Sequence, residues 1–191
     1  MKSVEAQIRA LEKKLTKIQS STVPLASNSA LNKVAAKIKT RTVKGVSKET
    51  LVKQKFIRQR MRVKKSKPDT QRAFLWVYVN DISAISLMKN VKFGAFKRKV
   101  AGKKYKNAWM ADGSKGFGRY KKGSGFSATK VKNKQIFRRT TKGRYPLEVI
   151  KIPILKPSTR ISRVVAERLM RNEFDQLYAH DLNWRLSKYA K

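Results

Sequence analysis

The chain has 191 residues, of which 48 are Lys or Arg and 11 are Asp or Glu, giving a formal charge of +37 at pH 7. It has no cysteine, which excludes a disulfide framework, a thiolate metal site and a cysteine nucleophile. Like charges at this density repel one another and oppose a compact state. We therefore expect a partner that neutralises them, either nucleic acid or the acidic faces of proteins in a permanent assembly.

The sequence shows neither a targeting segment nor a membrane span. Residues 1–5 read MKSVE and lead into no apolar stretch with a cleavage site. The longest apolar run, Ala73 to Val79, has seven residues, whereas a membrane helix needs about 20. We expect a protein that is soluble and intracellular, or part of a particle assembled inside a cell, with no membrane partner.

Residues 1–22 are predicted to form an amphipathic helix. Its apolar residues recur at spacings of three and four, and residues 20–24 (SSTVP) are predicted to end it. The seam suits either packing on its own domain or a helix–helix contact between subunits. The seam residues are Val4, Ile8, Leu11, Leu15 and Ile18.

Residues 24–191 are predicted to form a single α+β domain that begins and ends with a long helix. The first helix should run from about Leu25 to Thr50 and bury a face that includes Val34, Ala35, Thr42 and Val46. The last should be capped at Ser158 and Thr159 and carry a stripe that starts with Ile161, Val164, Val165 and Leu169. It holds four of the eleven acids, so it suits core or subunit packing.

Between these helices the sequence predicts a small, mostly antiparallel sheet. Residues 73–79 read as a buried strand, and residues 131–140 and 147–152 as two strands joined by a turn at 141–143. A basic insertion at about 89–144 contains a long glycine-rich loop at 113–126.

Cations are concentrated in residues 51–67 and in the insertion, which has nineteen Lys or Arg and one acid. They form either a solvated basic surface or a surface that contacts phosphates or an acidic partner. Aromatic residues in the insertion could stack bases or anchor a partner protein: Tyr105, Trp109, Phe117, Tyr120 and Phe126. The candidate contact residues are Arg58, Arg60, Arg62, Lys64, Lys65, Lys97, Arg98, Lys99, Lys103, Lys104, Arg119, Lys121, Lys122, Arg138 and Arg139.

No pattern indicates catalysis. The one histidine, His180, has only Asp181 beside it, and adjacent helix residues do not face each other. Glu173 and Asp175, two apart on a predicted helix, point to different faces. The glycines do not match a phosphate-binding GxxxxGK[ST] loop. We expect no catalytic residues, no metal and no cofactor.

Residues 144–157 read RYPLEVIKIPILKP and resemble the signature of the minor tail protein Z family of lambda-like phages and prophages. Pro146 and Pro153 flank a short strand and limit its length. For Arg144 and Lys151, a stabilised turn and a solvated strand face are favoured over direct DNA contact. The matching positions are Arg144, Tyr145, Pro146, Val149, Lys151, Ile152, Pro153 and Pro157.

The resemblance implies a structural virion protein without enzymatic activity that completes the tail or neck at its head-proximal end. It implies a closed ring of copies, often sixfold, assembled in the host cytoplasm. The expected partners are tail terminator, tail tube or head–tail joining proteins and the end of the packaged double-stranded DNA, bound non-specifically. The alternative, supported by composition, is a ribosomal-like or general sequence-independent nucleic-acid-binding protein.

Overall fold

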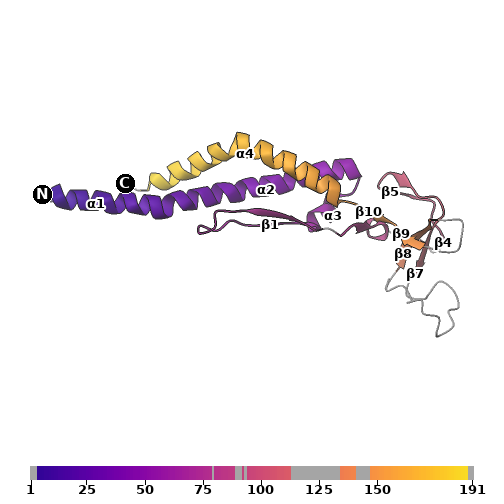
Figure 1. Ribbon diagram of the computed structural model, residues 1–191. Coiled ribbons are helices and arrows are strands. Elements are labelled where there is room, and N and C mark those ends of the chain that lie inside the picture. The colour runs from indigo at the N-terminus through magenta and orange to yellow at the C-terminus, as the bar shows by residue number, and fades with distance from the viewer. Residues whose placement is uncertain are drawn as a thin grey trace, which may run out of the picture. The chain divides into compact units, whose positions relative to one another are not determined.

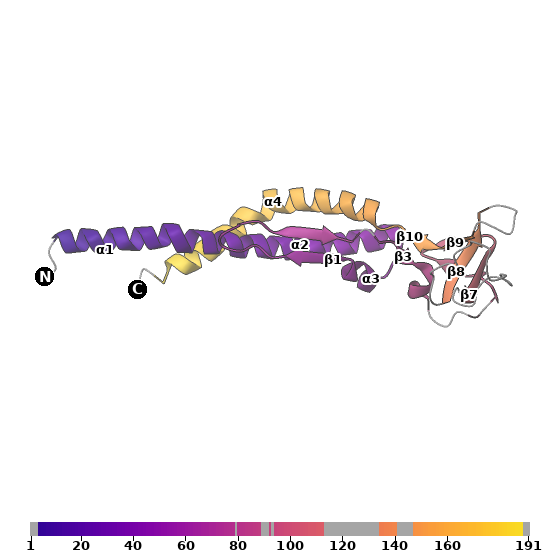
Figure 2. The same ribbon diagram turned by 60° about the horizontal axis from the view of Figure 1, so that its bottom comes forward.

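The computed structural model describes residues 4–78, 80–88, 92, 94–112, 134–140 and 147–188 (Figures 1 and 2). The chain divides into two compact units. The first comprises Met1–Gly45, Arg58–Tyr78 and Ser158–Lys191, and the second Val46–Ile57 and Val79–Pro157. The predicted α+β class is confirmed: N-terminal helices, small antiparallel sheets and a long C-terminal helix are present. That residues 24–191 form a single domain stays a prediction.

The N-terminal helices follow each other without a break. Helix α1 spans Val4–Lys17, a π-helical turn spans Ile18–Thr22, and α2 spans Val23–Thr50. The predicted helix end at residues 20–24 is therefore wrong. The N–H of Val23 donates to the carbonyl of Ile18, five residues back, and Pro24 follows directly. A proline has no N–H to donate, so it is tolerated beside a widened turn that has already shifted the α-helical bonding pattern.

Small residues let α2 and α4 (Leu155–Leu186) pack closely in the first unit, and both views show the two helices side by side (Figures 1 and 2). Ala30 and Val34 of α2 are buried, as is Leu169 of α4. At Gly45 a Cβ would lie 2.9 Å from Cγ2 of Ile161. This is closer than carbon atoms normally approach, so the missing side chain makes room for α4.

Two details of the predicted C-terminal helix are wrong. Helix α4 starts at Leu155, so Pro157 and Ser158 lie within its first turn rather than before it. The first-turn N–H groups have no partner inside a helix, so a proline there removes no bond. Val164 is exposed and does not belong to the packed stripe.

A β-hairpin of β1 (Met61–Lys64) and β2 (Phe74–Val77) lies along α2 (Figures 1 and 2). Its inner face carries Met61, which is fully buried, opposite Val77. The strand at 73–79 is confirmed over β2, but its predicted burial is wrong, since every second residue of β2 is exposed. An antiparallel hairpin with one covered face alternates between core and solvent.

Asn32 of α2 fastens this hairpin to the helix. Its Oδ1 accepts the N–H of Ser66 at 2.7 Å, and its Nδ2 donates to the carbonyl of Ser66 at 3.3 Å. Ser66 is buried, so these two backbone groups depend on the Asn32 side chain. The amide thereby sets where the hairpin sits along α2.

The second unit is built on an antiparallel sheet of order β4-β7-β8-β9. Ile136 and Phe137 of β8 and Met110 of β7 are buried in its core. Two short pairs, β3 with β10 and β5 with β6, accompany the sheet. The first four residues of α3, Gln54 to Ile57, and the 3₁₀ turn Ala84–Leu87 complete the unit. The bounds are α3 Gln54–Gln59, β3 Ile82–Ser83, β4 Gly94–Ala95, β5 Lys99–Val100, β6 Lys103–Lys104, β7 Ala108–Asp112, β8 Lys134–Arg139, β9 Leu147–Val149 and β10 Lys151–Ile152.

The single strand predicted at 147–152 is wrong, because Ile150 divides it. Its N–H donates to Ile136 of β8 at 2.8 Å, and its carbonyl accepts the N–H of Ala84 at 2.9 Å. The residues before it therefore pair with β8 and those after it with β3. The strand predicted at 131–140 is confirmed over β8, whereas the turn at 141–143 and the glycine-rich loop at 113–126 lie outside the described residues.

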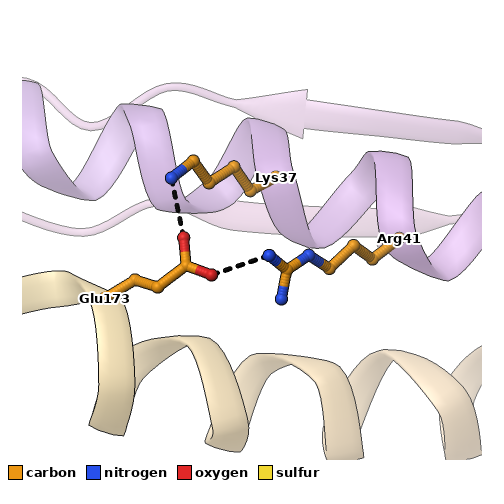
Figure 3. A network of polar contacts seen from close by, with 3 residues as sticks. All are labelled: Lys37, Arg41 and Glu173. Atoms are coloured by element: carbon orange, nitrogen blue, oxygen red, sulfur yellow. Dashed lines mark hydrogen bonds and ion pairs between the residues drawn. The ribbon is translucent and has the colours of Figure 1, made fainter.

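Carboxylates of α4 bind cations of α2. Glu173 contacts Nζ of Lys37 and Nη2 of Arg41, each at 2.7 Å (Figure 3). The hydrogen bond from Lys37 is the largest influence on the pKa of Glu173 and, with the charges of Arg41 and Lys37, holds it below 4.5 despite partial burial. Burial raises the pKa of Asp181, but its bond to Lys33 and neighbouring charges outweigh this and lower it.

We predict that acid weakens the α2–α4 contact. A carboxyl whose pKa is lowered by folding stabilises the native state above its unfolded pKa, and this contribution is lost as the pH falls through 4.5 and the lower folded value. Glu173→Gln should therefore lower stability at neutral pH and flatten its decline in acid. Asp175→Asn makes the same charge change at an exposed site on the same helix. Urea unfolding at a series of pH values measures both, and equal pH dependence in the two variants would contradict the prediction.

We also predict that Asn32→Ala destabilises the protein by about 1–3 kcal/mol, because two buried backbone groups of Ser66 lose their partner. Asn172→Ala, an exposed asparagine within α4, should change stability by less than about 0.5 kcal/mol. Denaturant unfolding compares the two. If Asn32→Ala costs no more than Asn172→Ala, the anchoring role is refuted.

Candidate nucleic-acid and partner interfaces

The outer surface of the β1–β2 hairpin combines cations with aromatic rings. The register places Arg62 opposite Trp76 and Lys64 opposite Phe74, and directly opposite residues share a face. The N–H of Tyr78 bonds the carbonyl of Arg60, which extends the pairing by one step. We call this surface the hairpin face and define it by Arg62, Lys64, Phe74, Trp76 and Tyr78.

All three aromatic rings of the hairpin face are open to solvent. Trp76 is 57% exposed, Phe74 49% and Tyr78 41%. The Arg62 guanidinium lies 5.7 Å from the centroid of the Tyr78 ring, within cation–π range. Between residues 60 and 78 the only acid is Asp69, in the turn beyond Lys67. In the described part of the chain, neither Arg62 nor Lys64 forms an ion pair.

The β5–β6 hairpin of the second unit is a second basic surface. Lys99 lies directly opposite Lys104, and both are exposed. Ala101 and Gly102 form the two-residue turn with positive φ angles of 48° and 76°, as tight hairpins require. Like charges placed directly across a pair of strands destabilise it. This pair therefore favours a nearby anion.

The described structure places the remaining candidate cations differently. Arg58 and Lys65 line a depression of about 340 Å³ beside α2. Arg138 is held by Glu148 through Nε at 3.2 Å and Nη2 at 3.0 Å. Lys97, Arg98 and Lys103 are exposed around β5 and β6, and Arg60 is half-buried. Arg119, Lys121 and Lys122 lie outside the described residues.

Of the aromatic residues predicted to bind in the insertion, the structure describes Tyr105 and Trp109, and both are half-buried. Trp109 is half-buried in β7, where its ring stacks on Phe137 at 6.4 Å and lies under the Arg139 guanidinium at 5.4 Å. Phe117, Tyr120 and Phe126 are outside the described residues. A role for them in binding stays a prediction.

Sequence reasoning missed the aromatic half of the hairpin face, because residues 73–79 read as a buried strand. A signal was present in the partner strand. Residues 60–64 read RMRVK, with a cation at every second position. This alternation is typical of a half-buried strand, and a strand paired with it must also expose one face.

The structure describes only some of the motif residues between 144 and 157. Arg144, Tyr145 and Pro146 lie outside the described residues. Val149 is half-buried in β9, and Ile152 is buried at the end of β10, where Pro153 follows. Lys151 is exposed, as a solvated strand face requires. Their functional roles stay predictions.

The apolar seam of α1 is uncovered in the described structure. Val4, Ile8, Leu11 and Leu15 are each between 53% and 72% exposed, and α1 has no buried residue. The same stripe continues through Ile18 into α2, where Ala26 is buried. The sequence left two alternatives for this helix, packing on its own unit or contacting another subunit. The structure does not show the first, because no residue of α1 is buried.

Residues suited to other chemistry are dispersed. Across the described ranges, no three His, Asp or Glu residues lie close enough together to hold a metal ion. No helix among those described combines the length and the apolar character that crossing a membrane requires. His180 is largely exposed, with Nδ1 3.9 Å from Oδ1 of Asp181.

Comparisons with known proteins identify the family. Residues 1–191 match the family described as "Prophage minor tail protein Z (GPZ)". The chain is 33% identical over 162 residues to the "Tail completion protein" of Escherichia phage N15, a match that covers 83% of each chain. No solved structure matches. The chain thus belongs to the prophage minor tail protein Z family and is a phage tail protein.

Proposed function

We propose that this tail protein is a non-enzymatic assembly subunit. It forms a ring with copies of itself at the head-proximal end of the tail, where it engages the end of the packaged double-stranded DNA. Tail terminator, tail tube or head–tail joining proteins are its further partners. The observation that carries the proposal is the pair of exposed basic hairpins, in which no described carboxylate forms an ion pair with Arg62, Lys64, Lys99 or Lys104.

The electrostatic argument follows from where the acids are. Glu173 and Asp181 are engaged by Lys33, Lys37 and Arg41, so they neutralise α2 rather than the hairpins. The net charge of +37 already counts all eleven acids, so the whole of it is left for external counterions. Phosphates of DNA are a dense array of such counterions, and contacts to them carry no sequence information. DNA engagement by this protein is therefore non-specific.

The assembly argument rests on α1. A closed ring needs two different complementary surfaces on each subunit. The uncovered seam of α1 supplies one apolar surface, and it continues a stripe that is already buried within the first unit. Burying such side chains gives roughly 1.5–3 kcal/mol each, which is enough for a short helix to hold a subunit in an assembly.

We predict that duplex DNA binding falls steeply with salt and loses part of that dependence when the β5–β6 lysines are removed. Each phosphate contact contributes about −0.9 to the slope of log K against log salt. Lys99→Gln with Lys104→Gln should reduce the slope by up to about 2, for any DNA sequence. Arg138→Gln is the control, because Glu148 already binds its guanidinium. Filter binding at several salt concentrations measures the slopes. Salt-insensitive or sequence-selective binding would sink the proposed DNA engagement.

We further predict that Leu11→Gln with Leu15→Gln abolishes assembly while the protein remains folded. Both side chains are exposed, so the fold loses little, whereas a buried seam would lose several kcal/mol, about 100-fold or more in affinity. Arg9→Gln with Lys13→Gln alters the opposite face of α1 and should have little effect. The measurement is completion of tails lacking this protein, scored by infectivity and by imaging of the particle. Normal tail completion by the seam variant would exclude α1 as an assembly surface.

A further inference from the structure

We propose that the hairpin face is a stacking surface for single-stranded nucleic acid. Phe74, Trp76 and Tyr78 would stack on bases, and Arg62 and Lys64 would bind the phosphates between them. The inference rests on the proposed engagement of DNA and adds to it a particular site and strand state.

The spacing of the rings suits this ligand. Alternate residues of a strand point to one face and repeat at about 6.8 Å. Phe74 and Trp76 of β2, with Tyr78 as the paired residue just after it, therefore present three rings in a row. Rings in such a row can each take one base of an extended strand. Stacking tolerates any base, because every base has a π face.

The cations stand beside the rings, where a backbone would pass. Register pairs Arg62 with Trp76 and Lys64 with Phe74, so each of these rings has a cation directly across the hairpin. Arg62 also reaches the Tyr78 ring. No acid lies on either strand, which leaves the face suited to a polyanion. Aromatic rings beside cations are the combination of side chains with which proteins bind single strands.

Duplex DNA explains the cations but not the rings. Bases inside a duplex are already stacked on one another, so exposed side-chain rings find no base face there. Basic side chains alone would suffice for phosphate contact. Keeping Trp76 and Phe74 half exposed to water sacrifices hydrophobic stabilisation, which indicates a ligand that covers them.

The hairpin face is held in place before any ligand arrives. Asn32 bonds both backbone groups of Ser66 at the end of β1, and Met61 and Val77 pack on the opposite side of the hairpin. A surface fixed in this way loses little conformational entropy on binding. It can therefore present its rings in a constant register.

Trp184 of α4 provides a matched comparison. Its side chain is 54% exposed, a fraction similar to the 57% of Trp76. It also lies beside cations, with Nζ of Lys188 3.8 Å and Cζ of Arg185 5.8 Å from its ring centroid. Trp184 stands on a helix, and in the described part of α4 the other aromatic rings, Phe174 and Tyr178, lie six or more residues before it. Its own cations already cover its π face.

The test measures binding of the full chain to fluorescent oligothymidine of about ten nucleotides and to a duplex of equal length, by anisotropy. Trp76→Ala should weaken single-strand binding about tenfold or more and duplex binding less than about twofold. Trp76→Phe should retain most of the single-strand affinity, and Trp184→Ala should leave both affinities unchanged. Circular dichroism checks that each variant is folded.

Three results would overturn the inference. Trp76→Ala could leave single-strand binding unchanged, or weaken duplex and single strand equally, which would reduce the face to a phosphate contact. Polyglutamate could compete as well as oligothymidine at equal charge, which would assign the face to an acidic protein partner. If any of these results is found while duplex binding remains salt-dependent, the proposed DNA engagement still holds and only the single-strand site is refuted. If the protein binds no nucleic acid at all, both proposals are refuted.

Discussion

The contact between α2 and α4 is the interaction on which the first unit depends. Small side chains on α2 and the bare Cα of Gly45 bring the helices together. Glu173 and Asp181, two of only eleven acids, then bind three cations of α2. In a chain of charge +37, carboxylates placed here relieve repulsion where backbones approach most closely. Because α4 holds α2 in position, α2 can in turn bind the β1–β2 hairpin through Asn32.

Because these carboxylates lie between α2 and α4, other basic surfaces have no acid to compensate their charge. With carboxylates used between α2 and α4, and Glu148 on Arg138, the hairpin face and the Lys99–Lys104 pair carry positive charge with no described acid beside it. Charge in this protein is therefore sorted rather than uniform. Neutralised cations hold the subunit together, and uncompensated ones face outward. Sorting of this kind suits a subunit that reaches its final stability within an assembly that supplies the missing anions.

The chain belongs to a family of phage tail proteins, so these surfaces can be considered as parts of a tail subunit. The ring around a DNA passage that we propose would need a surface for its neighbours and another for a polyanion. The uncovered α1 seam and the two basic hairpins have the corresponding chemistries. The hairpin face differs from the β5–β6 lysines in adding aromatic rings, which is why we assign it to strands whose bases are open. We thus propose that the hairpin face contacts both the bases and the phosphates of single strands, whereas the β5–β6 lysines contact phosphates alone.

The sequence by itself determined the helices, the α+β class and the family, because helical periodicity and the motif at residues 144–157 are local properties. It did not determine that the helix continues through Pro24, because this depends on a widened turn in which the N–H of Val23 bonds to Ile18, five residues back. Nor did it determine that Ile150 divides a strand, because this depends on hydrogen bonds to Ile136 and Ala84 in other segments. Tertiary structure alone decided which side of β2 is covered. The apolar run at 73–79 looks buried on both faces, but α2 lies against only one. Covering one face is what turned Phe74, Trp76 and Tyr78 from predicted core residues into a surface.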